Sequence, residues 1–124
     1  MQTDILDKDS INKLVVTFYT RVLKNEKLAP FFIEHLGEDL NSHKWDGHMQ
    51  LLTQFWTTVM TGSDDYNGFP FPPHAHMGLD KEAFENWIEV FFETVDELFI
   101  EEIANRFKEK SSIIASNFMR NLGI

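Results

Sequence analysis

The chain has 124 residues, the length of one domain, and 43% of them are hydrophobic, which excludes a disordered chain. Its formal net charge of −9 repels phosphate backbones and anionic lipid, so we expect neither nucleic acid nor a membrane as a partner. It contains no cysteine, which excludes disulfides, thiolate metal sites and cysteine nucleophiles.

The segment from Met1 to Leu6 lacks the basic stretch and following apolar stretch of a signal peptide. No apolar run approaches the roughly 20 residues that span a bilayer. We therefore expect a cytoplasmic protein that forms a single domain over residues 1–124.

Apolar residues recur at intervals of three and four along most of the chain, which predicts amphipathic helices. The first helix is expected over about residues 9–24, with its start capped by Asp9 or Ser10. A short turn of helix follows around residues 28–36 and ends at Gly37, a residue type that often stops helices.

The remaining helices are predicted in the same way. Asn41 or Ser42 can cap the next helix, which ends at Gly62, and Asp80 can cap another. An apolar stripe over residues 103–122 predicts the last helix, and no alternating run predicts a strand. The expected fold class is all-α, with four main helices and one irregular stretch.

The irregular stretch, residues 62–73, contains three of the four prolines and is followed by His74 and His76. Long loops in compact domains are often functional, and a histidine after paired prolines is held in a defined direction. The two histidines are two residues apart, so on a helix they would point to different faces. From spacing alone, each is either an ordinary surface histidine or a ligand of a metal or cofactor.

Two further polar residues lie on apolar stripes. His48 shares the inward stripe of its predicted helix with Leu52, and it is either a hydrogen-bonded core histidine or a functional one. Tyr19 lies at the inner edge of the first helix. Its hydroxyl either reaches water or points into a pocket, where it can donate a hydrogen bond to a small ligand.

Several segments, taken in order, resemble the truncated haemoglobins, and among them group III. The similar segments are Phe18-Tyr19, Leu28 to Phe32, Trp45 to His48, Phe55-Trp56, Tyr66 to Pro70 with the following His74, Phe84, and Trp87 to Phe91. The resemblance implies a truncated globin fold, a two-on-two helical sandwich around haem b (iron protoporphyrin IX). It also implies that His74 ligates the iron, with His76 as the second choice.

The resemblance assigns further residues to the haem pocket. Phe32 would pack against the haem, with Phe31 close behind it, and Leu52 would form part of the pocket wall. The ligand side would carry Tyr19, His48 and Trp87, and Trp87 would also contact the haem. A further hypothesis is that His48 binds the iron when no gas ligand is present.

The implied function is reversible binding of O₂, NO and CO. Several hydrogen-bond donors near one small ligand imply slow O₂ release, which suits O₂ or NO chemistry better than bulk transport. One alternative is an NO dioxygenase or a peroxidase-like enzyme; the chain holds no reductase domain, so a separate reductase would supply the electrons. Another alternative is a haem-free helical interaction domain.

Overall fold

A computed structural model describes residues 2–63 and 78–124. Within these residues the chain forms helices and no strand; an isolated parallel bridge joins Thr3 to Phe99. The helices are α1 (Lys8–Val22), α2 (Ala29–Leu36), α3 (His43–Thr61), α5 (Lys81–Leu98) and α6 (Glu101–Leu122). The all-α prediction is confirmed.

The helix starts follow from local side-chain hydrogen bonds. Ser42 caps α3 and Asp80 caps α5, as predicted, each accepting a hydrogen bond from a backbone N–H of the first turn. The prediction for α1 was wrong, because Asp7 is its cap. Ser10 is the third residue of α1. Its N–H donates a hydrogen bond to the Asp7 carboxylate and its hydroxyl accepts one from the Asp7 N–H, so the two residues form a capping box.

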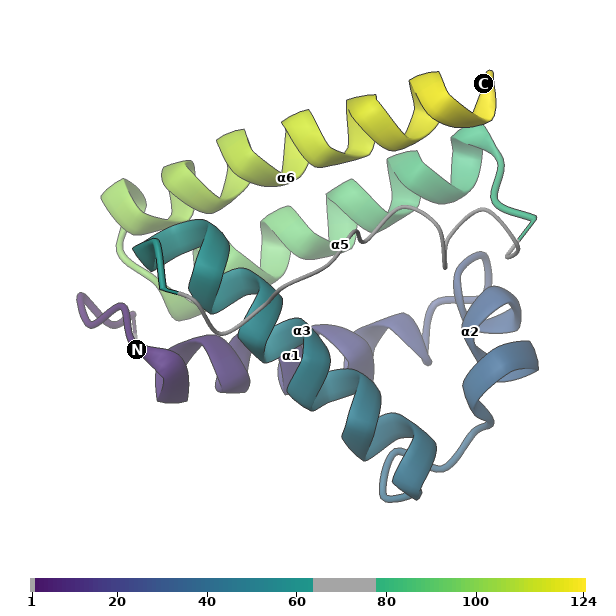
Figure 1. Cartoon of the computed structure of the whole chain (residues 1–124), viewed down its shortest axis with the longest axis horizontal. Coiled ribbons are helices and arrows are strands. Elements are labelled where there is room, and N and C mark those ends of the chain that lie inside the picture. The colour runs from purple at the N-terminus through teal and green to yellow at the C-terminus, as the bar shows by residue number, and fades with distance from the viewer. Residues whose placement is uncertain (1, 64–77) are drawn as a thin grey trace.

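The helices pack as two pairs. α1 packs against α3, and α5 packs against α6, while α1 also contacts α5 and so joins the pairs. Figure 1 shows α5 and α6 running side by side above the pair formed by α1 and α3, with the short α2 at one end. This is the two-on-two arrangement that the resemblance implied.

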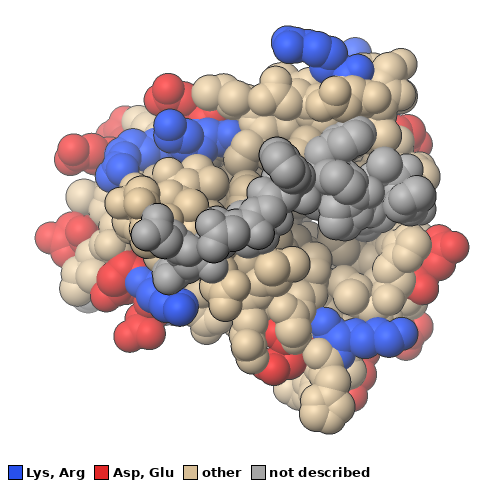
Figure 2. Space-filling view, viewed as in Figure 1, with Lys and Arg blue, Asp and Glu red and all other residues tan. Residues whose placement is uncertain are grey.

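The core lies between the two pairs, and its largest fully buried side chains include Trp45, Phe91, Phe99 and Phe107. In the view of Figure 2, charged side chains lie mainly toward the margins, and uncharged side chains occupy much of the centre of the described surface. In the described ranges, no helix has both the length and the apolar character needed to cross a membrane.

Candidate functional site

An apolar pocket lies between the two helix pairs. The space among its side chains is about 830 Å³, a figure that includes space open to solvent. Its described lining residues are Val15, Phe18, Tyr19, Leu28, Phe32, Leu52, Phe55, Trp56, Leu79, Ala83, Phe84, Trp87, Phe91, Ile114, Ala115 and Phe118. All five described helices supply side chains to these walls, so the pocket depends on the whole fold.

Polar side-chain groups are rare in this lining. Among the described lining residues they are the Tyr19 hydroxyl and the indole N–H groups of Trp56 and Trp87. Tyr19 is only 5% exposed, and its burial raises the pKa of the phenol well above the ordinary value, while a hydrogen bond with the Trp87 side chain acts in the opposite direction. The hydroxyl is therefore protonated at neutral pH and can donate a hydrogen bond.

Aromatic neighbours hold the Tyr19 ring in place. Its ring centroid lies 5.5 Å from that of Phe32, 5.4 Å from that of Trp45 and 5.1 Å from that of His48. Phe18, the preceding residue, contacts it edge-on with centroids 4.9 Å apart. Rings packed on several sides leave the hydroxyl oxygen little freedom of position.

Comparison with known proteins identifies the family. A family model for bacterial-like globins matches residues 4–119. The group 3 truncated hemoglobin ctb of Campylobacter jejuni is 31% identical over 123 residues, which cover 98% of this chain and 95% of that protein. The crystal structure of group III truncated hemoglobin from Campylobacter jejuni matches with a TM-score of 0.90 at 31% identity, over 98% of this chain and 95% of that one.

The chain is a bacterial-like globin of the group III truncated haemoglobins. Members of this family bind haem, and diatomic gases bind to the haem. The pocket fits such a group, because a flat, largely apolar macrocycle needs the apolar walls and aromatic faces that line it.

The globin pocket brings together four residues that the sequence singled out. Tyr19, Phe32, Leu52 and Trp87 all line it. Phe31 is half-buried and packs against the core without appearing in the described lining. Of the two phenylalanines, Phe32 is thus the better placed to contact haem, and this contact stays a prediction.

His48 lies behind Tyr19 in this globin. It is absent from the described pocket lining, and its ring packs edge-on against Tyr19 and against Trp45, with centroids 5.1 Å and 5.6 Å apart. Its Nε2 atom is buried. His48 therefore adjoins the pocket through Tyr19.

The two candidate iron ligands, His74 and His76, lie outside the described residues. The next described pocket residue after them is Leu79, which forms part of the wall just before α5. Within residues 2–63 and 78–124, no group of three or more His, Asp or Glu side chains could hold a metal ion. The choice between His74 and His76 stays a prediction.

Sequence reasoning missed one wall of the pocket. Phe84 on α5 and Ala115 and Phe118 on α6 form a small buried cluster that lines it, with Ile114 beside them. The helical period marked this stripe as apolar, which is the pattern of any core-facing helix. The helical spacing of apolar residues does not show which of them face a cavity and which pack in the core.

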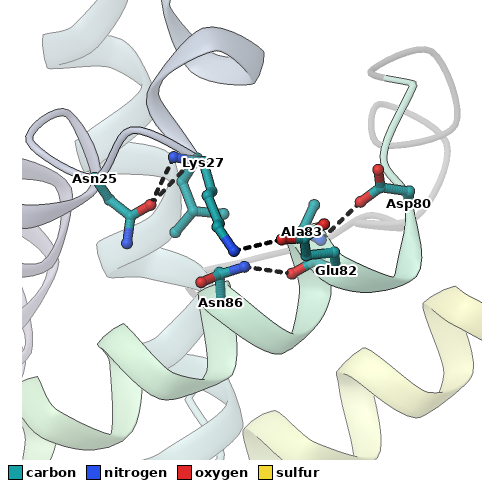
Figure 3. Close-up of polar contacts among 7 residues, drawn as sticks. Asn25, Lys27, Asp80, Glu82, Ala83 and Asn86 are labelled. Atoms are coloured by element: carbon teal, nitrogen blue, oxygen red, sulfur yellow. Dashed lines mark hydrogen bonds and ion pairs between the residues drawn. The ribbon is translucent and has the colours of Figure 1, made fainter.

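An ion pair lies at the rim of the globin pocket. Lys27, in the segment between α1 and α2, contacts Glu82 in the first turn of α5, with Nζ and Oε1 2.5 Å apart (Figure 3). Their neighbours in the chain, Leu28 and Ala83, both line the pocket. The hydrogen bond and charge of Glu82 raise the pKa of the Lys27 ammonium, so the pair joins the two sides of the rim at neutral pH.

Proposed function

We propose that this globin binds O₂ reversibly on the side of the pocket that carries Tyr19 and Trp87, and that it releases O₂ slowly. The bound haem, proposed to be haem b, supplies the iron at which the gas binds. The observation that carries the proposal is that the Tyr19 hydroxyl and the Trp87 indole N–H lie in one pocket whose described lining is mostly apolar. Donors fixed in a dry pocket stabilise the partial negative charge of bound O₂.

Burial supports this role for Tyr19. A phenol with a raised pKa keeps its proton throughout the physiological pH range, so the donor is always present. The ring contacts to Phe32 and Trp45 hold the hydroxyl oxygen in one position before any ligand enters. A donor that needs no rearrangement loses less free energy on binding.

We further propose His74 as the iron ligand, with His76 as the second choice. A neutral imidazole is the usual proximal ligand of a globin iron. Both histidines precede the pocket residue Leu79 in the sequence, His74 by five positions and His76 by three.

Other assignments follow from the lining. We propose that Phe32 packs against the haem, with Phe31 supporting it, and that Leu52 bounds the space next to the gas ligand. His48 is proposed to act on the ligand through Tyr19, which it contacts edge-on.

Stopped-flow measurement of O₂ release tests the proposal. Tyr19→Phe and Trp87→Phe each remove one donor and keep an aromatic ring, and we expect each to speed release by roughly five- to tenfold, the effect of one hydrogen bond of about 1 kcal/mol. Phe92→Leu is the matched control, because Phe92 is a half-buried aromatic residue of α5 that is absent from the described lining. Fast release in the wild type, unchanged by Tyr19→Phe and Trp87→Phe, would overturn the proposal.

The same pair of donors favours O₂ or NO chemistry over bulk transport. Slowly released O₂ remains available to react with NO, which is the property an NO dioxygenase needs; a peroxidase-like activity is the related alternative. In either case we expect a cytoplasmic protein served by a separate reductase. Turnover of NO by the oxygenated globin with an added reductant would distinguish an enzyme from a binding protein.

A further inference from the structure

Three aromatic rings from α3 and α5 form a stack inside the globin. Phe91 lies between Trp87 and Trp56. Its ring is nearly parallel to that of Trp87, with centroids 5.0 Å apart and planes at 7°, and close to parallel with Trp56, at 5.1 Å and 21°. These separations lie in the range of favourable ring stacking. All three side chains line the pocket.

Phe18 closes the stack from the side. Its ring meets Trp87 edge-on, with centroids 5.5 Å apart and planes at 81°, and meets Phe91 at 5.3 Å and 88°. It also contacts Tyr19, its neighbour on α1. One set of rings therefore extends from α3 through α5 to the tyrosine on the ligand side.

Trp87 is the least buried residue of the stack, so core packing restrains its ring less than it restrains the other two. Phe91 and Trp56 are buried at 2% and 4% exposure, whereas Trp87 is half-buried. An indole carries one N–H on one edge, so the plane of the ring decides where that donor points. Trp87 and Tyr19 both line the pocket and both contact Phe18 edge-on, and the stacked face of Phe91 is the surface that defines the indole plane.

The spacing in sequence explains how this contact arises. Trp87 and Phe91 are four residues apart on α5, so their side chains are neighbours on one helix face. Trp56 stacks with Phe91 from α3. This second contact, to another helix, restricts the movement of the phenyl ring if the indole turns.

We propose that Phe91 is a positioning residue: its ring, stacked with Trp56 and Trp87, fixes the indole plane and so the direction of the Trp87 N–H inside the pocket that it shares with Tyr19. The inference rests on the proposed function, in which Tyr19 and Trp87 are the donors to the gas ligand. Replacing Phe91 with Leu removes the flat face, so the indole can rotate and its N–H no longer points in one direction.

The test uses the full-length haem-loaded globin in its ferrous CO form, with two spectroscopic measurements. The chain has three tryptophans, so proton–nitrogen NMR shows three indole N–H signals at most, and Trp87→Phe assigns one by its loss. The infrared C–O stretching frequency reports hydrogen bonds to bound CO and rises when a donor is lost. In Phe91→Leu we expect the Trp87 indole signal to move and the C–O frequency to shift toward that of Trp87→Phe.

Phe107→Leu is the matched control. Phe107 is fully buried and contacts Phe91 and Trp56, and no ring contact joins it to Trp87 among the described residues. Phe91→Met, whose unbranched side chain adapts more easily to the space that the ring leaves, provides a second variant if Phe91→Leu does not fold. In either Phe91 variant, O₂ release should speed up by roughly two- to fivefold, less than in Trp87→Phe, because the donor is misdirected and not removed.

The outcomes separate the inference from the proposed function. Shifts in the Phe91 variants without shifts in Phe107→Leu support the positioning role. Equal shifts in Phe107→Leu, or unchanged spectra in the Phe91 variants while Trp87→Phe shifts, would overturn it and leave the proposed function standing. Unchanged C–O frequency and O₂ release in Trp87→Phe itself would overturn the role of Trp87, and the positioning role with it.

Discussion

The indole N–H of Trp45 donates a hydrogen bond to the carbonyl oxygen of Gly37, with Nε1 and O 2.8 Å apart. Gly37 ends α2, and Trp45 lies in the first turn of α3, so this bond closes the corner between the two helices. Trp45 also packs against Phe32 and Tyr19. The bond therefore stabilises the elements that hold two pocket side chains.

Trp45→Phe should destabilise the globin by about 1–3 kcal/mol, because it leaves the Gly37 carbonyl without this donor and creates a small gap in the core. Urea unfolding followed by circular dichroism measures the effect. Trp87→Phe is the control, since Trp87 is only half-buried. Equal stability of Trp45→Phe and the wild type would contradict a structural role for the bond.

Much of the fold was predictable because it depends on local chemistry. Ser42 and Asp80 were identified as caps from their residue types and the apolar stripes that follow them. Asp7 was missed because Ser10, its partner in the capping box, is itself a typical cap residue. Asp7 and Ser10 lie within one turn and both have residue types typical of caps. The sequence does not show which of them has the extended backbone of a cap.

The site was less predictable, because it depends on which helices meet. The sequence left Tyr19 with its hydroxyl in water or in a pocket; the structure buries it, through contacts with Phe32 on α2 and Trp45 on α3. Phe91 looked like an ordinary core residue, and its stacking between two tryptophans appears only when α3 packs near α5. Such contacts depend on how helices pack together, so the spacing of apolar residues in the sequence does not predict them.

Asp80→Ala and Lys27→Met should differ in their effect on stability, although both residues lie near the start of α5 (Figure 3). Asp80 accepts a hydrogen bond from the Ala83 N–H at 2.8 Å, and loss of such a cap costs about 1 kcal/mol. Lys27 and Glu82 are well exposed, so solvent and salt screen their ion pair. Thermal unfolding of both variants should show a lower midpoint only for Asp80→Ala; a clear drop for Lys27→Met would mean that the rim pair stabilises the fold.

His48 should have a smaller effect on O₂ release than Tyr19, because it adjoins the ligand side only through the Tyr19 ring. His48→Leu is therefore expected to change the release rate less than Tyr19→Phe does. For the same reason the ferrous protein without a gas ligand should show no six-coordinate low-spin component in its optical spectrum. If that component is present in the wild type and disappears in His48→Leu, the histidine binds the iron instead.

The Tyr19 phenol should stay protonated at pH values where an exposed tyrosine ionises. Burial raises its pKa in the folded state above the ordinary value of 10.0, so the unfolded chain loses this proton first. The contribution of the buried, protonated phenol to the free energy of unfolding is fully present below about pH 10. It decreases as the pH rises further, because ionisation then favours the unfolded state. Tyr19→Phe should flatten this alkaline loss of stability in pH-dependent urea unfolding, and an unchanged slope would contradict the burial of the phenol.

Removal of the iron ligand should distinguish His74 from His76. We expect His74→Ala to lose the Soret band of the purified globin or to change it strongly, because the iron then lacks its protein ligand, and His76→Ala to keep the wild-type spectrum. Added imidazole should restore a ligated spectrum in His74→Ala, which separates loss of the ligand from loss of the fold. Circular dichroism of both variants checks that the helical content is unchanged. The reverse pattern, with the band lost only in His76→Ala, would transfer the ligand role to His76, two residues closer to the pocket wall at Leu79.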